Sequence, residues 1–286
     1  MTRLPDEFVA RLAAARAECA VPVGLPARAE AFARNVLALL FPHHAYERRV
    51  TPADVAADAD RALEIARRFI ADAPGIGDRV DIVAGEFAAC LPSMYDALLD
   101  DAQETYDFDP AAGSVDEVIL AYPGFFALAC YRCARHLWYR KVELLPRLVT
   151  EFAHSLTGID IHPGARLGRA ISIDHGTGIV IGETAVVGDR VRFYQGVTLG
   201  ALSVKKTASR EQRHPTIEDD VVLYSNAIVL GGSTVVGARS IIGGNVWLTR
   251  SVPPDSIVTE VPNIAHRPAD GEDRSHPDET HRPERT

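Results

Sequence analysis

Residues 217–247, IEDDVVLYSNAIVLGGSTVVGARSIIGGNVW, decide the fold, because an apolar residue recurs there at every sixth position. The series consists of Ile217, Leu223, Val229, Val235, Ile241 and Trp247. A period of six matches neither the 3.6-residue period of an α-helix nor the two-residue alternation of a single strand. It is typical of a parallel β-helix, in which each repeat supplies one short strand and one corner. We expect these repeats to continue without a slip.

The same period runs upstream of this stretch and is interrupted twice. The upstream series consists of Ile161, Leu167, Ile173, Ile181, Val187, Phe193 and Leu199. A two-residue slip follows Ile173 and carries Asp174 and His175. The second interruption separates Leu199 from Ile217 by 18 residues. Because three repeats form one coil, we expect this second segment to replace about one coil of sequence.

The chain before the repeats has the composition of helices, with Ala, Leu, Arg and Glu dominant. The predicted helical segments are Glu7–Ala20, Ala27–Leu40, Pro52–Ala71, Asp81–Asp101, Pro123–Tyr139 and Val142–Leu156. Thr51-Pro52 is typical of a helix start, and Thr157-Gly158 of a helix end at which Gly is left-handed. The prediction is an α+β chain with a helical N-terminal domain over 1–157, a β-helix over 158–262 and a disordered polar tail over 263–286.

Composition excludes several classes of protein. The formal net charge of −9 argues against a nucleic-acid-binding surface, which is basic in most such proteins. The N-terminus has no apolar signal core, and the apolar stretch at 118–130 is too short to cross a bilayer. The four cysteines do not form a disulfide framework, and Cys130 and Cys133 are expected to pack inside a helix. We therefore expect a cytoplasmic protein with no membrane and no nucleic-acid partner.

A histidine stands beside a charged residue at each interruption, and these positions form the candidate site. The candidate residues are Asp160, His162, Asp174, His175, Arg213 and His214, with Asp109 from the helical region. Histidine can take a proton near neutral pH, and arginine offers a planar fork that suits a carboxylate. A structural alternative stays open, in which Asp174-His175 caps a corner, Arg213-His214 is a solvated pair and His162 only packs.

Five segments together resemble the bacterial serine O-acetyltransferase family. They are DIHPGARLGRAISIDHGTGIVIGETAVVGDRV at 160–191, QGVTLGA at 195–201, RHPTIEDDVVLYSNAIVLGG at 213–232, GGNVWLTRSVPP at 243–254 and DFDPAAGSVDEVILAYPGFFALACYRCARHLW at 107–138. The resemblance covers about residues 105 to 267. It implies a left-handed coil, a hand that departs from the usual right-handed crossover. It also implies acetyl transfer from acetyl-CoA to the hydroxyl of L-serine, which is the committed step of cysteine biosynthesis.

The resemblance assigns a role to each candidate residue. His175 matches the general base, Asp160 the carboxylate that orients it, and His214 a second active-site histidine. Arg213 matches the residue that holds the serine carboxylate, and Asp109 and Asp174 match acidic groups near the substrate amine. The matching acetyl-CoA positions are Ala201, Ser225 and Gly243. Acetyl-CoA is a co-substrate here, and neither a metal nor a permanently bound cofactor is expected.

The resemblance also implies partners. The family forms homotrimers that pair into hexamers, and L-cysteine inhibits it by mimicking serine. The family's complex with cysteine synthase depends on a C-terminal Ile, whereas this chain ends Glu284-Arg285-Thr286, so that complex is not expected. Gln212 stands where the family often has Asp, and the loop before it, with Lys205 and Lys206, is longer than in short family members.

Three rival functions stay open at this point. Another hexapeptide-repeat O- or N-acetyltransferase, acting on a sugar or an antibiotic, would keep His175 but need neither Asp109 nor Arg213. A metal-dependent β-helix enzyme would need three convergent histidines, for which His162, His175 and His214 are the candidates. A non-catalytic scaffold would leave both interruptions unexplained.

Overall fold

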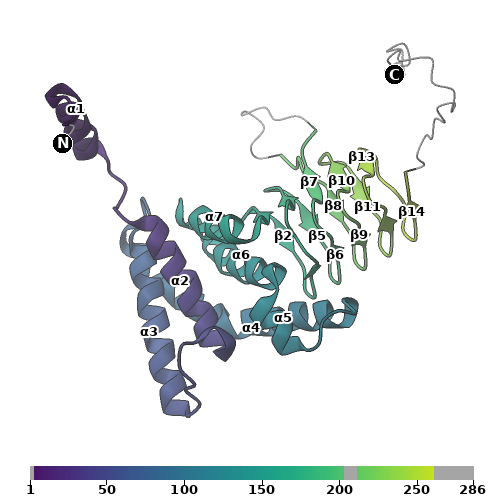
Figure 1. Ribbon diagram of the computed structural model, residues 1–286, viewed down its shortest axis with the longest axis horizontal. Helices are drawn as coiled ribbons and strands as arrows, with labels where there is room; N and C mark the ends of the chain where they lie inside the picture. Colours follow the sequence, from purple (N-terminus) through teal and green to yellow (C-terminus); the bar gives the residue numbers. More distant parts are fainter. Residues whose placement is uncertain (1–2, 203–210, 261–286) are drawn as a thin grey trace, which may run out of the picture.

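The computed structural model describes residues 3–202 and 211–260, in which a group of helices precedes a stack of parallel coils (Figure 1). The helices are α1 (Asp6–Glu18), α2 (Leu25–Leu40), η1 (Pro42–His44), α3 (Pro52–Ala71), η2 (Gly77–Arg79), α4 (Val80–Phe108), α5 (Val115–Ala121), α6 (Pro123–Tyr139) and α7 (Leu145–Thr157). Pro52–Ala71 and Pro123–Tyr139 confirm the predicted bounds, whereas α4 is longer than predicted and α5 was not predicted.

Local signals explain where two of these helices begin and end. The Thr51 hydroxyl accepts the N–H of Asp54, and the Asp54 carboxylate accepts the N–H of Thr51, which is a complete capping box for α3. Gly158 ends α7 with φ of +72°, a left-handed conformation that glycine adopts without steric cost. The chain changes from helix to strand between Thr157 and Asp160.

The coils form a prism with three flat sheets, in which all strands pair in parallel and the inner strands pair with the coils above and below. The strands are β1 (Asp160–Ile161), β2 (Arg166–Leu167), β3 (Ser172–Ile173), β4 (Val180–Ile181), β5 (Val186–Val187), β6 (Arg192–Phe193), β7 (Thr198–Gly200), β8 (Thr216–Ile217), β9 (Val222–Leu223), β10 (Ile228–Leu230), β11 (Val235–Val236), β12 (Ile241–Ile242), β13 (Trp247–Leu248) and β14 (Ile257–Val258). The sheet orders are β1-β4-β7-β10-β13, β11-β8-β5-β2 and β14-β12-β9-β6-β3. The predicted β-helix is confirmed.

The register confirms the first interruption and corrects the interpretation of the second. Ile161 pairs with Ile181, so the first coil has 20 residues and contains the predicted two-residue slip. Leu199 lies in β7, and Ile217 lies in β8 of the next sheet. The intervening segment therefore does not replace a coil. It enlarges one corner, because the strand partner of Leu199 in the following coil is Val229.

The register also contains a slip that the sequence pattern did not predict. Val236 pairs with Ile217, 19 residues earlier, so one extra residue enters the coil after β10. The side chains of Val236 and Ile242 are fully buried, whereas Trp247 is 66% exposed. The predicted inward positions at Val235, Ile241 and Trp247 are therefore wrong by one residue.

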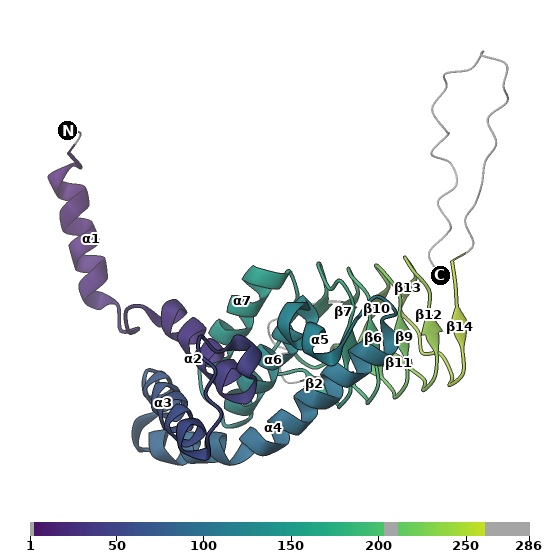
Figure 2. The same cartoon turned by 60° about the horizontal axis from the view of Figure 1, so that its bottom comes forward.

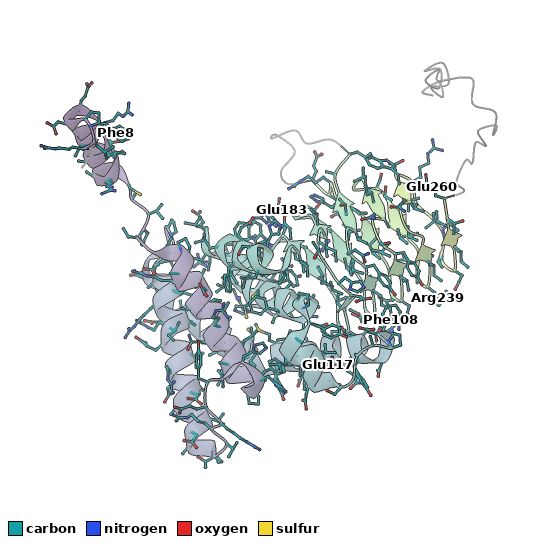
Figure 3. All side chains as sticks on the ribbon, viewed as in Figure 1. Phe8, Phe108, Glu117, Glu183, Arg239 and Glu260 are labelled. Carbon is teal, nitrogen blue, oxygen red and sulfur yellow. The ribbon has the colours of Figure 1, made fainter. Side chains whose placement is uncertain are left out.

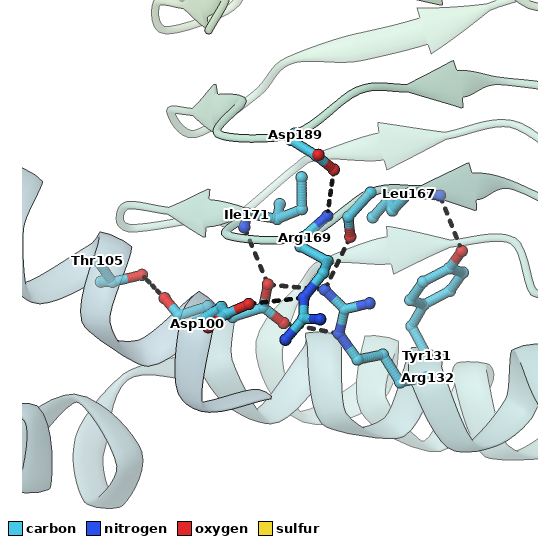
Figure 4. A network of polar contacts seen from close by, with 10 residues as sticks. Asp100, Thr105, Tyr131, Arg132, Leu167, Arg169, Ile171 and Asp189 are labelled. Atoms are coloured by element: carbon cyan, nitrogen blue, oxygen red, sulfur yellow. Dashed lines mark hydrogen bonds and ion pairs between the residues drawn. The ribbon is translucent and has the colours of Figure 1, made fainter. Parts of the chain in front are cut away.

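The helices cover the open edge of the first coil, mainly through α4 and α6 (Figures 2 and 4). The Tyr131 hydroxyl donates to the carbonyl of Ala165 at 2.7 Å and accepts the N–H of Leu167 at 3.1 Å. The fully buried Asp101 carboxylate accepts two bonds from Arg132, both 2.7 Å long, and the N–H of Ile171 at 2.9 Å. Polar groups at the edge of the coil are thus satisfied by buried side chains of the helices.

Among the described helices, the stretch Gly77–Phe108 is long and apolar enough to cross a membrane by length and composition. Its apolar face packs into the helical core through Phe87, Leu91 and Leu98. The same helix carries the buried ion pair between Asp101 and Arg132. These contacts join the helix to the helical core and to Arg132 of α6.

Candidate active site

The two interruptions of the repeat lie at different corners of the prism. His175 follows β3 and precedes β4, at the corner that also holds Tyr194 and Tyr224; we call residues 174–179, 194–197 and 224–227 the His175 corner. His214 precedes β8, at the corner that begins after β7; we call residues 162–165, 182–185 and 211–215 the His214 corner. The sheet β1-β4-β7 separates the two corners.

Figure 3 makes this separation visible, because two labelled residues mark the two corners. Phe108 packs on Tyr194 of the His175 corner, with ring centroids 5.9 Å apart, and Glu183 belongs to the His214 corner. The two labels lie on opposite sides of the β-helix. Within one chain, therefore, His175 and His214 do not share a site.

The His175 corner exposes the imidazole beside a carboxylate. The backbone of His175 has φ of +57°, in the left-handed region that residues other than glycine adopt infrequently. Its side chain is 71% exposed. The same left-handed φ occurs at corners of ordinary length, as at Asn226 and Asn245, so it is a general feature of these corners; at His175 it accompanies a ring that lies outside the prism. Nδ1 of His175 lies 3.7 Å from a carboxylate oxygen of Asp174, which is itself mostly buried.

The carboxylates of Asp109 and Asp174 surround the same aromatic side chains. The Tyr122 hydroxyl donates to Oδ2 of Asp109 at 2.6 Å, and this bond, with burial and the charge of Asp109, raises the pKa of Tyr122 to about 12; the charges of Glu117 and Asp174 add smaller effects. Burial raises the pKa of Tyr194, and the charges of Asp174 and Asp109 add to that effect. The charges of Asp109 and Asp174 thus act on the same two tyrosines, Tyr122 and Tyr194. The rings of Tyr194 and Tyr224 stack beside it at 4.9 Å.

The structure does not bring Asp160 and His175 together. Oδ1 of Asp160 lies 3.3 Å from Nη1 of Arg147, a residue of α7, and no contact within the described chain joins Asp160 to the His175 ring. Glu151, His154 and Asp160 present atoms within 4.8 Å of one another, as metal ligands would. The Arg147 guanidinium binds both Glu151 and Asp160, however, and so supplies positive charge to this cluster itself.

The His214 corner is held together by Thr184. The Thr184 hydroxyl accepts the backbone N–H groups of Arg213, at 2.9 Å, and His214, at 3.0 Å. The Arg213 guanidinium forms an ion pair with Glu183. Gln212 donates to the carbonyls of Thr184 and His214, both at 2.7 Å, which closes the corner.

Both histidines of this corner are neutral at physiological pH. The His214 side chain is buried, and burial, reinforced by the charge of Arg213, lowers its pKa to about 4. Burial also lowers the pKa of His162, whose Nδ1 accepts the N–H of Gly164 at 3.0 Å. The ring of His162 packs edge-on against Trp138 at 5.0 Å. His162 is thus engaged in local packing.

The three positions assigned to acetyl-CoA lie on two corners. Ser225 and Gly243 belong to successive coils on the side of the His175 corner, and the Ser225 carbonyl accepts the N–H of Asn245 at 2.9 Å. Ala201 follows β7 at the opposite edge of the sheet. A Cβ on Gly243 would lie 2.9 Å from the Val258 carbonyl oxygen, so the backbones of the two coils approach closely there.

Sequence reasoning missed Glu183 and Thr184 of the His214 corner, and Tyr122 and Arg147, which contact candidate residues from the helical region. Glu183 and Thr184 occupy ordinary positions of a repeat and carry no break in phase. Gly182 beside them follows an apolar residue like other glycines of the repeat, and only the structure shows that a Cβ there would lie 2.0 Å from Cδ2 of His214. Arg147 and Tyr122 are contributed by the helical region, where the six-residue pattern gives no information.

A helical unit followed by a hexapeptide-repeat coil, with histidines at two irregular corners, defines the class of β-helical acyltransferases. No family model matches the sequence. The chain is 51% identical over 179 residues to the plasmid serine acetyltransferase of Synechococcus elongatus, covering 61% of this chain and 56% of that relative. It is 45% identical over 169 residues to serine acetyltransferase of Mycobacterium tuberculosis, covering 59% of this chain and 72% of that protein. The chain belongs to the serine acetyltransferase family.

Solved structures agree with this membership. Serine acetyltransferase isoform 3 of Entamoeba histolytica, crystallised with cysteine, superimposes with a TM-score of 0.75 at 33% identity, covering 83% of this chain and 84% of that one. A native serine acetyltransferase 1 of the same organism gives a TM-score of 0.73 at 33% identity, over 80% and 86% of the two chains. The fold is an N-terminal helical region followed by a left-handed parallel β-helix.

Proposed function

We propose that this chain transfers the acetyl group of acetyl-CoA to the hydroxyl of L-serine, giving O-acetyl-L-serine and CoA for cysteine biosynthesis. The observation that carries the proposal is the exposed His175 ring beside the Asp174 carboxylate, with Asp109 acting on the same two tyrosines as Asp174. A pair of carboxylates suits an ammonium group, and an accessible imidazole suits a proton acceptor. A sugar acceptor would have no ammonium for these charges to bind.

His175 is the proposed general base. Its imidazole removes the hydroxyl proton while the serine oxygen attacks the thioester carbonyl carbon, and the tetrahedral intermediate then breaks its C–S bond. The proton returns from the imidazolium to the departing CoA thiolate, so the base is regenerated. A positioned base contributes about 10²–10⁴-fold to the rate. Asp160 remains the proposed orienting carboxylate, although its described contact is with Arg147 and the carboxylate beside the His175 ring is that of Asp174.

We propose that the complete site forms between two chains. Arg213 is the group proposed to hold the serine carboxylate, and His214 is the proposed second histidine, yet both lie across a sheet from His175. A neighbouring chain that offers its His214 corner to this His175 corner would complete the set. A homotrimer, which could pair into a hexamer, provides such neighbours around the prism.

Several further assignments belong to the same proposal. Acetyl-CoA would lie along the coils near Ala201, Ser225 and Gly243, with no resident metal or cofactor. L-Cysteine would compete with serine, since it offers the same ammonium and carboxylate. We assign catalysis to the β-helix at 158–262 and packing between subunits to the helical region at 1–157. The proposed enzyme is cytoplasmic. The tail at 263–286, together with Lys205 and Lys206, lies outside the described residues.

The experiment is a thiol-release assay with acetyl-CoA and a panel of amino acids and sugars. We expect release that depends on serine and falls by at least about 100-fold in His175→Ala. His43→Ala is the matched control, because His43 lies on η1 and pairs with Asp116, away from both corners. Acetylation of a sugar in preference to serine, or full activity in His175→Ala, would refute the proposal.

A further inference from the structure

The Thr184 side chain is the centre of a small, saturated hydrogen-bond network. Its Oγ1 accepts the N–H groups of Arg213 and His214, and it lies 2.8 Å from Nδ1 of the His214 ring. Both lone pairs of the hydroxyl are therefore occupied by backbone donors. The hydroxyl hydrogen is left to point at Nδ1 of His214.

The backbone of the same residue fixes the protonation of the ring. The N–H of Thr184 lies 3.1 Å from Nδ1 of His214 and donates to it. A backbone N–H can only donate, so Nδ1 must offer a lone pair and carry no proton. The neutral ring of His214 therefore holds its single hydrogen on Nε2. This assignment follows from the contacts of Thr184 alone and needs no assumption about a substrate.

The surroundings of His214 favour the same state. The ring lies directly over Gly182, which presents no side chain, and only 8% of the residue is exposed. The charged and titratable groups that act on it are Arg213, Glu183 and His162. Burial and the Arg213 charge oppose protonation, and Glu183 is already engaged by the Arg213 guanidinium.

We propose that Thr184 is a positioning residue that locks His214 as an Nε2–H donor. In the reaction proposed above, on which this inference rests, His214 donates that hydrogen to the oxyanion that forms on the thioester carbonyl. His214 takes up no proton during the cycle, so His175 is the sole base. A fixed donor aimed at a developing oxyanion needs no reorganisation when the charge appears.

The direct test is ¹⁵N NMR of the full chain labelled at histidine, with His214→Gln used to assign the His214 signals among the ten histidines. We expect Nδ1 of His214 to show the shift of an unprotonated nitrogen and Nε2 that of a protonated one, unchanged between about pH 8 and 6. A proton on Nδ1, or an imidazolium at pH 7, would overturn the proposal. This readout does not depend on which acceptor is acetylated, so it separates this inference from the proposed function.

The kinetic test compares side chains that can donate with one that cannot. The amide of Gln reaches the place of Nε2 and donates but is no base, so His214→Gln should keep kcat within about tenfold of wild type. His214→Ala should lose about 100-fold or more. Equal loss in the two variants, with both folded by circular dichroism, would contradict a donor role.

Thr184 is tested by its own pair of substitutions. Thr184→Ser keeps the hydroxyl and should retain wild-type kcat and the single His214 tautomer. Thr184→Val keeps the shape but removes the hydroxyl, so kcat should fall about tenfold and a second tautomer should appear in the ¹⁵N spectrum. An unchanged spectrum and unchanged kcat in Thr184→Val would overturn the positioning role.

Discussion

Replacing Gly182 with Ala should displace the His214 ring and lower activity without unfolding the protein. The backbone of Gly182 is not left-handed, so Ala fits it, but the added Cβ would lie 2.0 Å from Cδ2 and 2.1 Å from Nε2 of His214. Ordinary contact begins near 3.4 Å, so the ring must move by about 1.4 Å. A misplacement of about 1 Å can cost about 10²-fold in rate, or about 2.7 kcal/mol of transition-state stabilisation.

The assay is CoA release from acetyl-CoA at varied serine concentrations, with the melting temperature measured in parallel. Gly85→Ala in α4 is the matched control, because a Cβ there meets nothing within 4 Å. The decisive measurement is a double variant: once His214→Ala has removed the ring, Gly182→Ala should cost no further activity. Wild-type kcat/KM in Gly182→Ala, or an undiminished cost in the double variant, would refute this reasoning.

Three further predictions concern stability. Asp101→Asn leaves the guanidinium of Arg132 buried without its charge partner and should cost about 3–5 kcal/mol in urea unfolding, whereas Asp100→Asn on the surface should cost under about 1 kcal/mol. Thr51→Ala removes the cap of α3 and should cost about 1 kcal/mol by the same measurement. Burial lowers the pKa of His214 from 6.5 to about 4, so the unfolded chain takes up a proton that the folded chain does not. The melting temperature should therefore fall as pH drops from about 6.5 to 4, and less so in His214→Gln; equal slopes would contradict this assignment.

The coils could be predicted from sequence because each inward residue repeats at a fixed spacing, but the exact phase could not. The extra residue after β10 shifts the inward positions to Val236 and Ile242. Each directly follows a residue of the same type, Val235 or Ile241. Since both members of each pair are apolar and β-branched, the sequence pattern fits either phase. Only Trp247 distinguished the two possible phases of the repeat, because its side chain is too large for the interior and is exposed in the structure.

The candidate site was predictable where it interrupted the repeat. His175 stood out because a corner with extra residues has no packing reason to exist, and His214 stood out for the same reason. The partner of Asp160 was not predictable, because Arg147 comes from α7 and reaches the coil only through tertiary packing. Thr184 was missed since it keeps the repeat in phase, and its role depends on His214, 30 residues further along the chain.

The covered edge of the first coil has a consequence for how the chain avoids self-association. A parallel β-helix is a stack with two ends, and each end offers a row of backbone donors and acceptors to any similar strand. At the first end, Tyr131, Arg132 and Asp101 occupy these groups from the helical side (Figure 4). A chain that began at Gly158 would uncover them and present a template for another stack. The helices therefore cap this end of the β-helix and block end-to-end pairing between the coils of different molecules.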